Sequence, residues 1–315
     1  MISGLGFGGA PIANLYTSVS DAGAWATIDT AWDAGVRYFD TAPHYGLGLS
    51  ERRLGAALRD RPRDEFVVST KVGRVLEAFD GGGLDDAGFL VPATHRRVWD
   101  FSADGVRRSL DSSLARLGLD RVDIVYLHDP DNHWEQALSE GLPALQSLKD
   151  QGVIRAVGVG MNQWQMPERF IREASLDYVM LAGRYTLLEQ ESLASFLPLC
   201  LDRGVSVVSV GVFNSGLLAR PEVPADATYD YSAAPASVVD RARRIAAVCQ
   251  RHGAVLPQAA LQFPFGHPAV KAIAVGARTP GEITENAALF ADKVSPDLWA
   301  DLKSEGMLAP DVPTP

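Results

Sequence analysis

Residues 38–46 read YFDTAPHYG. The apolar residues at the start are typical of a short buried strand, and the Pro and Gly that follow end such a strand in a loop. Asp40 closes the apolar segment and Tyr45 stands five positions later. Two further segments, TKVG at 70–73 and LHDPD at 127–131, also carry polar side chains where an apolar run ends. The sequence therefore predicts that polar groups from three consecutive strands gather at one edge of a sheet.

Strand-like and helix-like segments alternate along the whole chain. Short runs rich in Val, Ile, Phe and Tyr are separated by longer segments of helical period, which indicates repeated strand-helix units and a parallel sheet. Eight such units are expected to close into an α/β fold of the (β/α)8 TIM-barrel type. The expected strands are Leu5–Gly8, Arg37–Asp40, Phe66–Lys71, Ile124–His128, Ala156–Gly160, Tyr178–Leu181, Ser206–Val210 and Ala272–Val275.

Length and charge limit the class of protein. The 315 residues would suffice for two average domains, but barrels commonly reach this length as one unit. Residues 1–309 are expected to form a single barrel, followed by a flexible tail at 310–315. The net charge of −10 argues against nucleic acid or an anionic membrane as a partner. A small-molecule substrate is favoured instead.

The start of the chain has neither a basic leader nor a long apolar core, so we expect a cytoplasmic protein. Cys200 and Cys249 are too few and too isolated for a disulfide framework or a zinc site. They are expected to be buried thiols without chemistry, and no metal is predicted. The expected assembly is a monomer or a small homo-oligomer.

Two connections exceed ordinary length. Residues 74–98, which contain GGGLDD, follow the third expected strand, and residues 213–234, rich in Pro, Ala and Asp, follow the seventh. Neither connection has a period of its own. Because loops that follow barrel strands lie on the catalytic face, both are expected to be functional lids rather than poorly ordered segments.

The polar residues at the strand ends can work as one proton-transfer unit. A tyrosine hydroxyl titrates near ~10, so Tyr45 can exchange a proton near neutrality only if a nearby cation stabilises the phenolate. Lys71 supplies that charge, and Asp40 can hold the ammonium and offset the cost of burying it. His128 can orient the substrate oxygen or join the relay. None of the four residues carries a hydride, so a nicotinamide cofactor is expected to do so.

Each of the four also has a purely structural explanation. Asp40 can cap a turn, Tyr45 can fill a loop, Lys71 can be solvated and His128 can be a hydrogen-bonded barrel residue. The catalytic interpretation depends on their convergence. The last residues of strands two, three and four all point into the mouth where barrel enzymes place their chemistry.

The strings YFDTAPHYG, TKVG and LHDPD resemble the aldo-keto reductase family, and the resemblance runs along essentially the whole chain. It implies that Tyr45 is the general acid or base and that Asp40, Lys71 and His128 complete a catalytic tetrad. It also implies NAD or NADP as cofactor and a sugar or carbonyl compound as substrate. The chain contains no GxGxxG motif, so a dinucleotide fold of the Rossmann kind is disfavoured.

The resemblance extends to cofactor contacts. Asn162, in the VGVGMN stretch after strand five, is similar to the asparagine that holds the nicotinamide amide in that family. Residues 275–290, VGARTPGEITENAALF, resemble the segment that binds the adenosine half. The matching positions there are Ala277, Arg278, Glu285 and Asn286. The last two can equally be an exposed first-turn pair of the final helix.

Some positions depart from the family's pattern. Glu282 stands where many relatives use an arginine to grip the 2′-phosphate, and its charge would repel that phosphate. NAD is therefore slightly favoured, although Arg278 nearby could still accept NADP. Val210 replaces an aromatic residue that often stacks on nicotinamide, and Ala182 replaces the usual glutamine. Tyr185 is expected to supply part of the missing contact.

Longer strings point to one branch of the family. WDFSADGVRRSLDSSLARLGLDRVDIVYLHDPD and VGVGMNQW are most similar to bacterial sugar dehydrogenases acting on L-fucose and other D-threo-aldoses, with L-galactose dehydrogenase and pyridoxal 4-dehydrogenase as further relatives. The resemblance implies oxidation of the anomeric carbon of a cyclic sugar to a lactone, with Tyr45 as base. The residues expected to line the sugar pocket are Asn14, His44, Trp99 and Asp129.

Other functions fit part of the pattern. The same site can run in reverse as an aldehyde or ketone reductase of a specialised pathway, because one proton and one hydride move in either direction. A cofactor-binding regulatory protein with slow turnover can keep the same fold and site. A metal-dependent barrel isomerase is disfavoured, because His128 and Asp129 have no second histidine at ligand spacing.

Overall fold

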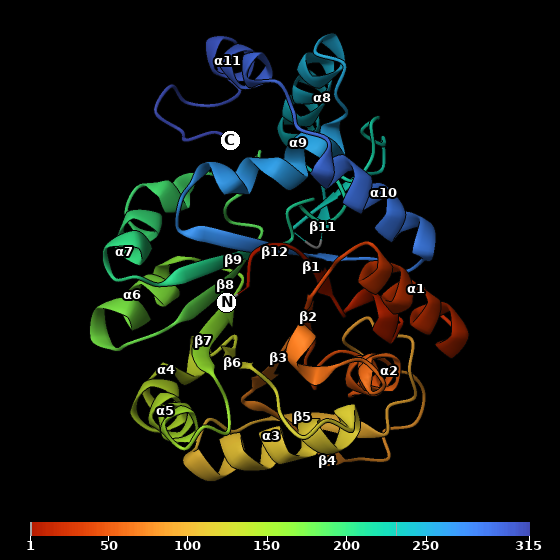
Figure 1. The fold of residues 1–315 in the computed structure, drawn as a ribbon, viewed down its shortest axis with the longest axis vertical. Coiled ribbons are helices and arrows are strands. Elements are labelled where there is room, and N and C mark those ends of the chain that lie inside the picture. The colour runs from red at the N-terminus through yellow and green to blue at the C-terminus, as the bar shows by residue number, and fades with distance from the viewer. Residues whose placement is uncertain (1, 231) are drawn as a thin grey trace.

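Eight parallel strands close into a barrel in the computed structural model, which describes residues 2–230 and 232–315 (Figure 1). Around the barrel the strands follow the order of the sequence, and the last pairs with the first to close it. They are β1 (Gly4–Gly8), β2 (Tyr38–Asp40), β3 (Val67–Val72), β6 (Ile124–His128), β7 (Ala156–Met161), β8 (Tyr178–Ala182), β9 (Ser206–Val210) and β12 (Val270–Gly276). The predicted (β/α)8 fold is confirmed.

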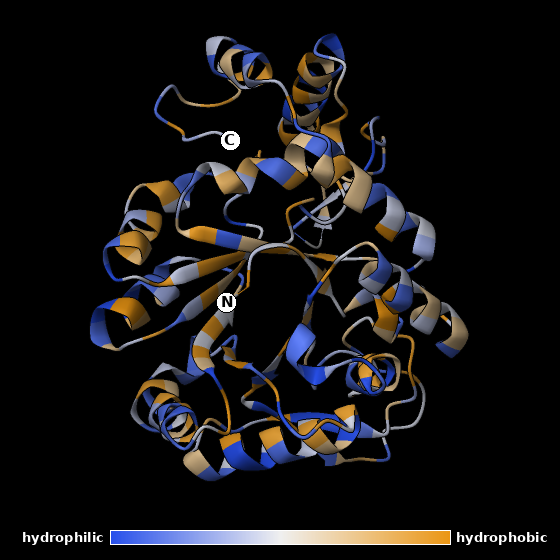
Figure 2. Cartoon of the chain, viewed as in Figure 1, coloured by the Kyte–Doolittle hydropathy of each residue, from blue (hydrophilic) through white to orange (hydrophobic). Residues whose placement is uncertain are grey.

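Helices cover the outside of the barrel (Figure 1). They are α1 (Asp21–Asp33), α2 (Leu49–Leu58), α3 (Ala103–Leu117), α4 (Trp134–Gln136), α5 (Leu142–Asp150), α6 (Gln165–Glu173), α7 (Phe196–Asp202), α8 (Ala236–Arg251), α9 (Leu256–Gln262), α10 (Pro280–Ala291) and α11 (Pro296–Ser304). Apolar side chains of the strands and helices form the main core between the two layers. The hydrophobic colours of Figure 2 accordingly run along the strands, whereas the helices alternate between hydrophobic and hydrophilic positions.

A second apolar cluster fills the inside of the barrel, and the pleat of the strands places the polar residues above it. Tyr38 and Tyr126 belong to this cluster, and the Tyr38 hydroxyl lies 2.9 Å from the Ser69 hydroxyl. Side chains two positions apart point to the same face of a strand. Asp40 and His128 therefore follow Tyr38 and Tyr126 on the inner face and reach the carboxyl end of the barrel.

The two long connections contain strands that the sequence did not predict. Residues 74–98 were expected to lack a period of their own, but β4 (Arg74–Ala78) and β5 (His95–Trp99) pair antiparallel as a hairpin. The second connection carries a smaller pair, β10 (Thr228–Tyr229) and β11 (Ser232–Ala233). Both faces of the first hairpin are only partly buried, so its side chains do not alternate between apolar and polar. The sequence therefore carries no strand period at 74–98 from which this hairpin could be recognised.

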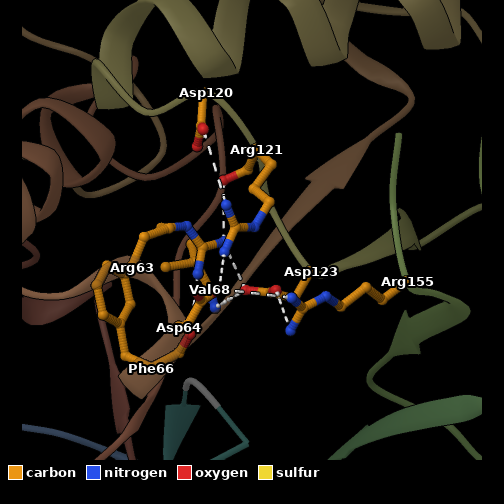
Figure 3. Close-up of polar contacts among 8 residues, drawn as sticks. All are labelled: Arg63, Asp64, Phe66, Val68, Asp120, Arg121, Asp123 and Arg155. Carbon is orange, nitrogen blue, oxygen red and sulfur yellow. Dashed lines mark hydrogen bonds and ion pairs between the residues drawn. The ribbon is translucent and has the colours of Figure 1, made fainter. Parts of the chain in front are cut away.

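A charged network lies at the amino ends of β3 and β6 (Figure 3). The buried carboxylate of Asp123 lies 2.6 Å from Arg63 and 3.3 Å from Arg155, and it also accepts the amide of Val68 at 2.8 Å. Two guanidinium groups and a backbone donor thus compensate the burial of this carboxylate. A network at the amino ends of barrel strands is typical of residues that contribute to stability.

The remaining features lie outside the barrel wall. Residues 310–315, which the sequence suggests are a flexible tail, lie against the protein: Val312 is buried, and the Pro313 carbonyl lies close to Gly266. Both cysteines are buried free thiols, as predicted. Among the described residues, no helix combines the length and the apolar character needed to cross a bilayer.

Candidate active site

The centre of the site is a buried ion pair between β2 and β3. The Lys71 ammonium lies 2.6 Å from Asp40 and donates a second hydrogen bond to the Thr41 carbonyl at 3.0 Å. The other carboxylate oxygen of Asp40 accepts a 2.6 Å hydrogen bond from Ser69. Desolvation lowers the pKa of Lys71, but the charges of Asp40 and Tyr45 outweigh it and raise that pKa. Lys71 is therefore a fixed cation inside the barrel mouth.

Tyr45 lies beside this cation. The Lys71 nitrogen is 4.7 Å from the centre of the Tyr45 ring, which lines the cavity described below. Burial raises the pKa of Tyr45 above its ordinary value, and the charge of Lys71 opposes that rise. The sequence predicted the opposing effect of Lys71 but not the larger effect of burial. At neutral pH the phenol accordingly holds its proton and has a neighbour that stabilises its anion.

Two imidazole rings complete this part of the wall. The His128 ring stands at 88° to the Tyr45 ring with 6.0 Å between centroids, and the His44 ring is 5.6 Å from that of His128. Desolvation, reinforced by nearby cations that include Arg74, lowers the pKa of His128 and lowers that of His44 to about 2. Both rings are therefore neutral. A carboxylate oxygen of Asp129 lies 3.7 Å from Nε2 of His128.

Asp129 connects the substrate side of the site to Asn162. The Arg74 guanidinium forms an ion pair with one carboxylate oxygen of Asp129, and the Asn162 amide donates to the other oxygen at 3.3 Å. Asp129 adopts a left-handed backbone conformation with a φ of 43°. This strained conformation turns the carboxylate that follows β6 across the mouth of the barrel.

These groups surround one cavity of about 320 Å³ at the carboxyl end of the barrel. Its polar wall contains the whole tetrad, together with His44, Arg74, Asp129 and Asn162. The rest of the lining includes small or apolar residues from strand ends: Gly8, Gly160, Ala182, Val210, Gly211 and Gly276. Ala182 and Val210 are register partners on β8 and β9, so they form a flat apolar surface.

The small residues of the cavity fit a planar cofactor ring. Gly8 and Gly276 are register partners, and a side chain built on Gly276 would come within 2.5 Å of Pro11. Pro11, which also lines the cavity, therefore packs directly against the backbone at Gly276. Ala182 and Val210 would offer a nicotinamide ring an aliphatic surface at the ends of β8 and β9.

The segment expected to bind the adenosine half begins α10. The Arg278 guanidinium pairs with Glu282 at 3.1 Å, and the backbone amide of Arg278 donates to the same carboxylate at 2.7 Å. Thr279 caps the helix through the Glu282 amide. Arg278 and Glu285 are exposed, Asn286 is half-buried and Ala277 is buried. All of these residues lie outside the cavity lining and extend from its rim at Gly276.

Three predicted site residues lie elsewhere. Tyr185 is fully buried and packs against Phe263 and His267, so it cannot supply the ring contact expected of it. Asn14 is outside the cavity lining, because its amide bonds Val19, Arg53 and Leu90. Trp99 is also outside that lining, and stacks on His133 and beneath Arg74. His44 and Asp129 do line the cavity.

Two contributing residues escaped the sequence analysis. Ser69 precedes Lys71 by two positions and is the register partner of Asp40, so the strand period could have indicated it. Arg74 had no such signal. It reaches the cavity because Gly73 has a φ of 102° and turns the chain back as β3 ends.

Comparison with known proteins agrees with this geometry. The model of the Aldo/keto reductase family matches residues 4–305. This chain belongs to the aldo/keto reductase family. It is therefore an oxidoreductase, and the resemblance drawn from the strand-end strings is confirmed.

Individual relatives cover almost the whole reductase. A D-threo-aldose 1-dehydrogenase from a Pseudomonas species is 48% identical over 100% of this chain and 96% of its own length. A pyridoxal 4-dehydrogenase from Microbacterium luteolum is 40% identical over 98% of this chain and 95% of its own. The solved glycerol dehydrogenase of Gluconobacter oxydans shares the fold, with a TM-score of 0.77, 23% identity and coverage of 100% and 94% of the two chains.

Proposed function

We propose that this reductase oxidises the anomeric hydroxyl of a cyclic aldose of the L-fucose, D-threo-aldose or L-galactose kind to a lactone, with NAD or NADP as hydride acceptor. The observation that carries the proposal is the position of Lys71, whose ammonium lies 2.6 Å from Asp40 and 4.7 Å from the Tyr45 ring centre, on the wall of the cavity. The 48% identity with a D-threo-aldose 1-dehydrogenase supports the choice of substrate class.

The mechanism assigns one task to each member of the tetrad. Tyr45 accepts the proton of the anomeric hydroxyl as the carbon–oxygen double bond forms, and Lys71 stabilises the phenolate that must exist beforehand. Asp40 keeps the ammonium in position through its short contact. His128, which is neutral, donates from Nε2 to the substrate oxygen and orients it. When bound, the nicotinamide cofactor supplies the acceptor for the hydride that leaves the same carbon.

NAD is the favoured cofactor. In this proposal Asn162 bonds the nicotinamide amide, and Ala277, Glu285 and Asn286 contact the adenosine half. The support for NAD is the ion pair between Glu282 and Arg278, which occupies the cation that a 2′-phosphate would need. Glu282 also adds negative charge to the first turn of α10, where a phosphate would otherwise be attracted.

Aldehyde or ketone reduction is a second candidate, and one observation favours it. Burial raises the pKa of Tyr45, so that the phenol is protonated near neutrality and ready to give a proton to a carbonyl oxygen. The same residues then act in reverse, because the proton that Tyr45 accepts during oxidation is the proton that it donates during reduction.

Initial rates with a defined substrate panel test the proposal. Reduction of NAD and NADP is followed with L-fucose, L-galactose, D-arabinose and pyridoxal, and NADH oxidation with small aldehydes. We expect an aldose to be the best substrate. Failure on all sugars with fast aldehyde reduction would favour the second candidate. Tight nicotinamide binding without turnover on any compound would indicate a regulatory protein instead.

A further inference from the structure

Arg74 occupies the cavity wall although it belongs to neither the tetrad nor the cofactor segment. It is the first residue of β4, and its guanidinium lies over the Trp99 ring with 4.5 Å between Cζ and the ring centre. The hairpin of β4 and β5 carries both residues, so Trp99 faces the guanidinium from the adjacent strand as its register partner. A cation held between an aromatic face and a carboxylate has few other positions to adopt.

The backbone before Arg74 fixes this placement. Gly73 has a φ of 102°, and a side chain built on it would meet the Phe101 ring at 2.0 Å. The chain therefore turns two residues after Lys71, and Lys71 and Arg74 both line the same cavity. Only 14% of the Arg74 side chain is exposed. Burying a guanidinium beside the reaction site is costly and calls for an explanation beyond packing.

The pair of Arg74 and Asp129 offers a complementary set of hydrogen-bonding groups. Arg74 has five N–H donors, of which Nη2 is directed at Asp129, and Asp129 has acceptor oxygens that also receive the Asn162 amide. Both side chains line the cavity next to His128. A guanidinium and a carboxylate side by side can bind two neighbouring hydroxyl groups, one through its oxygen and one through its hydrogen.

The charges of this part of the wall compensate each other. Arg74 and Asp129 compensate each other, and the two nearby histidines are neutral because burial and the surrounding cations lower their pKa values. A ligand with a net charge beside this wall would meet either the cation or the anion without full compensation. A neutral compound with several hydroxyl groups can bond both.

We propose that Arg74 is a specificity-determining residue that donates hydrogen bonds to the substrate hydroxyl adjacent to the reacting carbon. The proposal rests on the proposed function, in which Tyr45 and His128 hold the oxygen of the reacting carbon itself. The neighbouring hydroxyl then lies toward Asp129, which follows His128 directly in the chain. Arg74 thereby makes the site select hydroxylated substrates over simple aldehydes of similar reactivity.

The test compares two variants with a matched control on paired substrates. Arg74→Met removes every donor but keeps a long apolar stem over Trp99, and Arg74→Lys keeps the charge but loses the planar fork. The control is Arg96→Met, since Arg96 lies on β5 of the same hairpin but is 61% exposed and pairs with Glu77. The paired substrates are an aldose and its 2-deoxy analogue for oxidation, and glyceraldehyde and propanal for reduction.

For Arg74→Met we expect kcat/KM for the aldose and for glyceraldehyde to fall about 10- to 100-fold, the loss expected of a charge-assisted hydrogen bond. For the 2-deoxy sugar and propanal the fall should stay below about three-fold, because no adjacent hydroxyl is present to lose its partner. Arg74→Lys should fall between wild type and Arg74→Met on the hydroxylated substrates. The Arg96→Met variant should keep the wild-type kcat/KM on all four substrates. The dissociation constant of the nicotinamide cofactor should be the same in every variant as in wild type.

Two outcomes would overturn the proposal. Equal losses of kcat/KM on hydroxylated and hydroxyl-free substrates would mean that Arg74 only holds the hairpin. No loss of kcat/KM on either kind of substrate would mean that Arg74 does not touch the substrate. Thermal unfolding of each variant identifies a folding defect, and Arg74→Lys carries the test if Arg74→Met does not fold. If the wild-type protein oxidises no aldose, the proposed function fails. The comparison of glyceraldehyde with propanal still decides the role of Arg74.

Discussion

The Lys71 ammonium lies 2.6 Å from the Asp40 carboxylate, and both side chains are almost fully buried at the ends of adjacent strands. Removing two charges from water costs several kcal/mol per ion, which an ion pair recovers only with additional hydrogen bonds. The Thr41 carbonyl and the Ser69 hydroxyl supply them. The arrangement keeps one cation fixed under the Tyr45 ring, where it acts on the acidity of the phenol.

Tyr45→Phe should lower turnover about 100- to 10,000-fold, the usual contribution of a general acid or base, because only the transferable proton is lost. Cofactor binding, measured by fluorescence titration, and the thermal unfolding midpoint should stay near wild type. Tyr16→Phe is the matched control, since Tyr16 is 64% exposed and lies outside the cavity. Retained turnover in Tyr45→Phe would remove Tyr45 from the mechanism.

Lys71→Met should both inactivate and destabilise the protein. The Asp40 carboxylate would remain buried without its counter-ion, which costs about 3–5 kcal/mol of unfolding free energy. Combining Lys71→Met with Asp40→Asn removes both charges and should recover most of that stability but none of the activity. Urea denaturation of the two single variants and the double variant measures this coupling. Equal and additive losses would show that the pair does not stabilise the mouth of the barrel.

Much of this site could be predicted because strand ends are easy to recognise. The strand β6 begins and ends at the predicted residues, and β3 differs from its predicted range by one residue at each end. The side-chain period of these strands then fixes where His128 and Lys71 point. The predicted aromatic contact of Tyr185 failed for the opposite reason. Tyr185 follows β8 in a loop, where no period decides which way a side chain faces, and it packs into the core.

Burial was the other quantity that the sequence could not supply. The position of Lys71 predicted that a cation would lower the pKa of the Tyr45 phenol. The net shift of that pKa also depends on how far Tyr45 is removed from water, and burial has the larger effect and raises it. Arg74 was missed because it acts through a tight turn at Gly73 and an antiparallel hairpin. Neither feature leaves an apolar period in the sequence.

The rates of oxidation and of reduction should depend on pH in opposite ways. Oxidation needs the Tyr45 phenolate, whose fraction increases with pH, and burial raises the pKa of this group. The oxidation rate should therefore increase with pH and still be rising at alkaline pH. Reduction needs the protonated phenol, so its rate should be constant near neutrality and fall only in alkaline solution. Initial rates in both directions across this range, at saturating cofactor, measure the two profiles; an oxidation rate that declines with pH would exclude a phenolate base.

Glu282→Arg should move cofactor preference toward NADP. The variant removes the carboxylate that pairs with Arg278 at 3.1 Å and leaves two cations at the start of α10, where a 2′-phosphate can bind. The ratio of kcat/KM for NADP to that for NAD should increase about ten-fold or more, as expected for a new charge-assisted contact. Glu173→Arg controls for net charge, because Glu173 lies on α6 away from the cavity. An unchanged ratio would mean that the 2′ position of the ribose does not approach Glu282.

Stability should fall as the solution becomes acidic, in part because of His44. Burial lowers the pKa of His44 from 6.5 to about 2. Between these values the unfolded chain binds a proton that the folded protein excludes, so the contribution of this group is complete above pH 6.5 and is lost as the pH falls. Each pH unit below that point costs about 1.4 kcal/mol.

His44→Gln should therefore flatten the pH dependence of the unfolding free energy between neutrality and pH 5, by about 2 kcal/mol over the interval. The difference between wild type and variant cancels the titration of other groups, so its slope, rather than any constant offset from lost packing, is the quantity to measure. His95→Gln, at the start of β5 and outside the cavity, serves as the control. A slope identical to that of wild type would mean that His44 gains its proton in the folded protein as readily as in the unfolded chain.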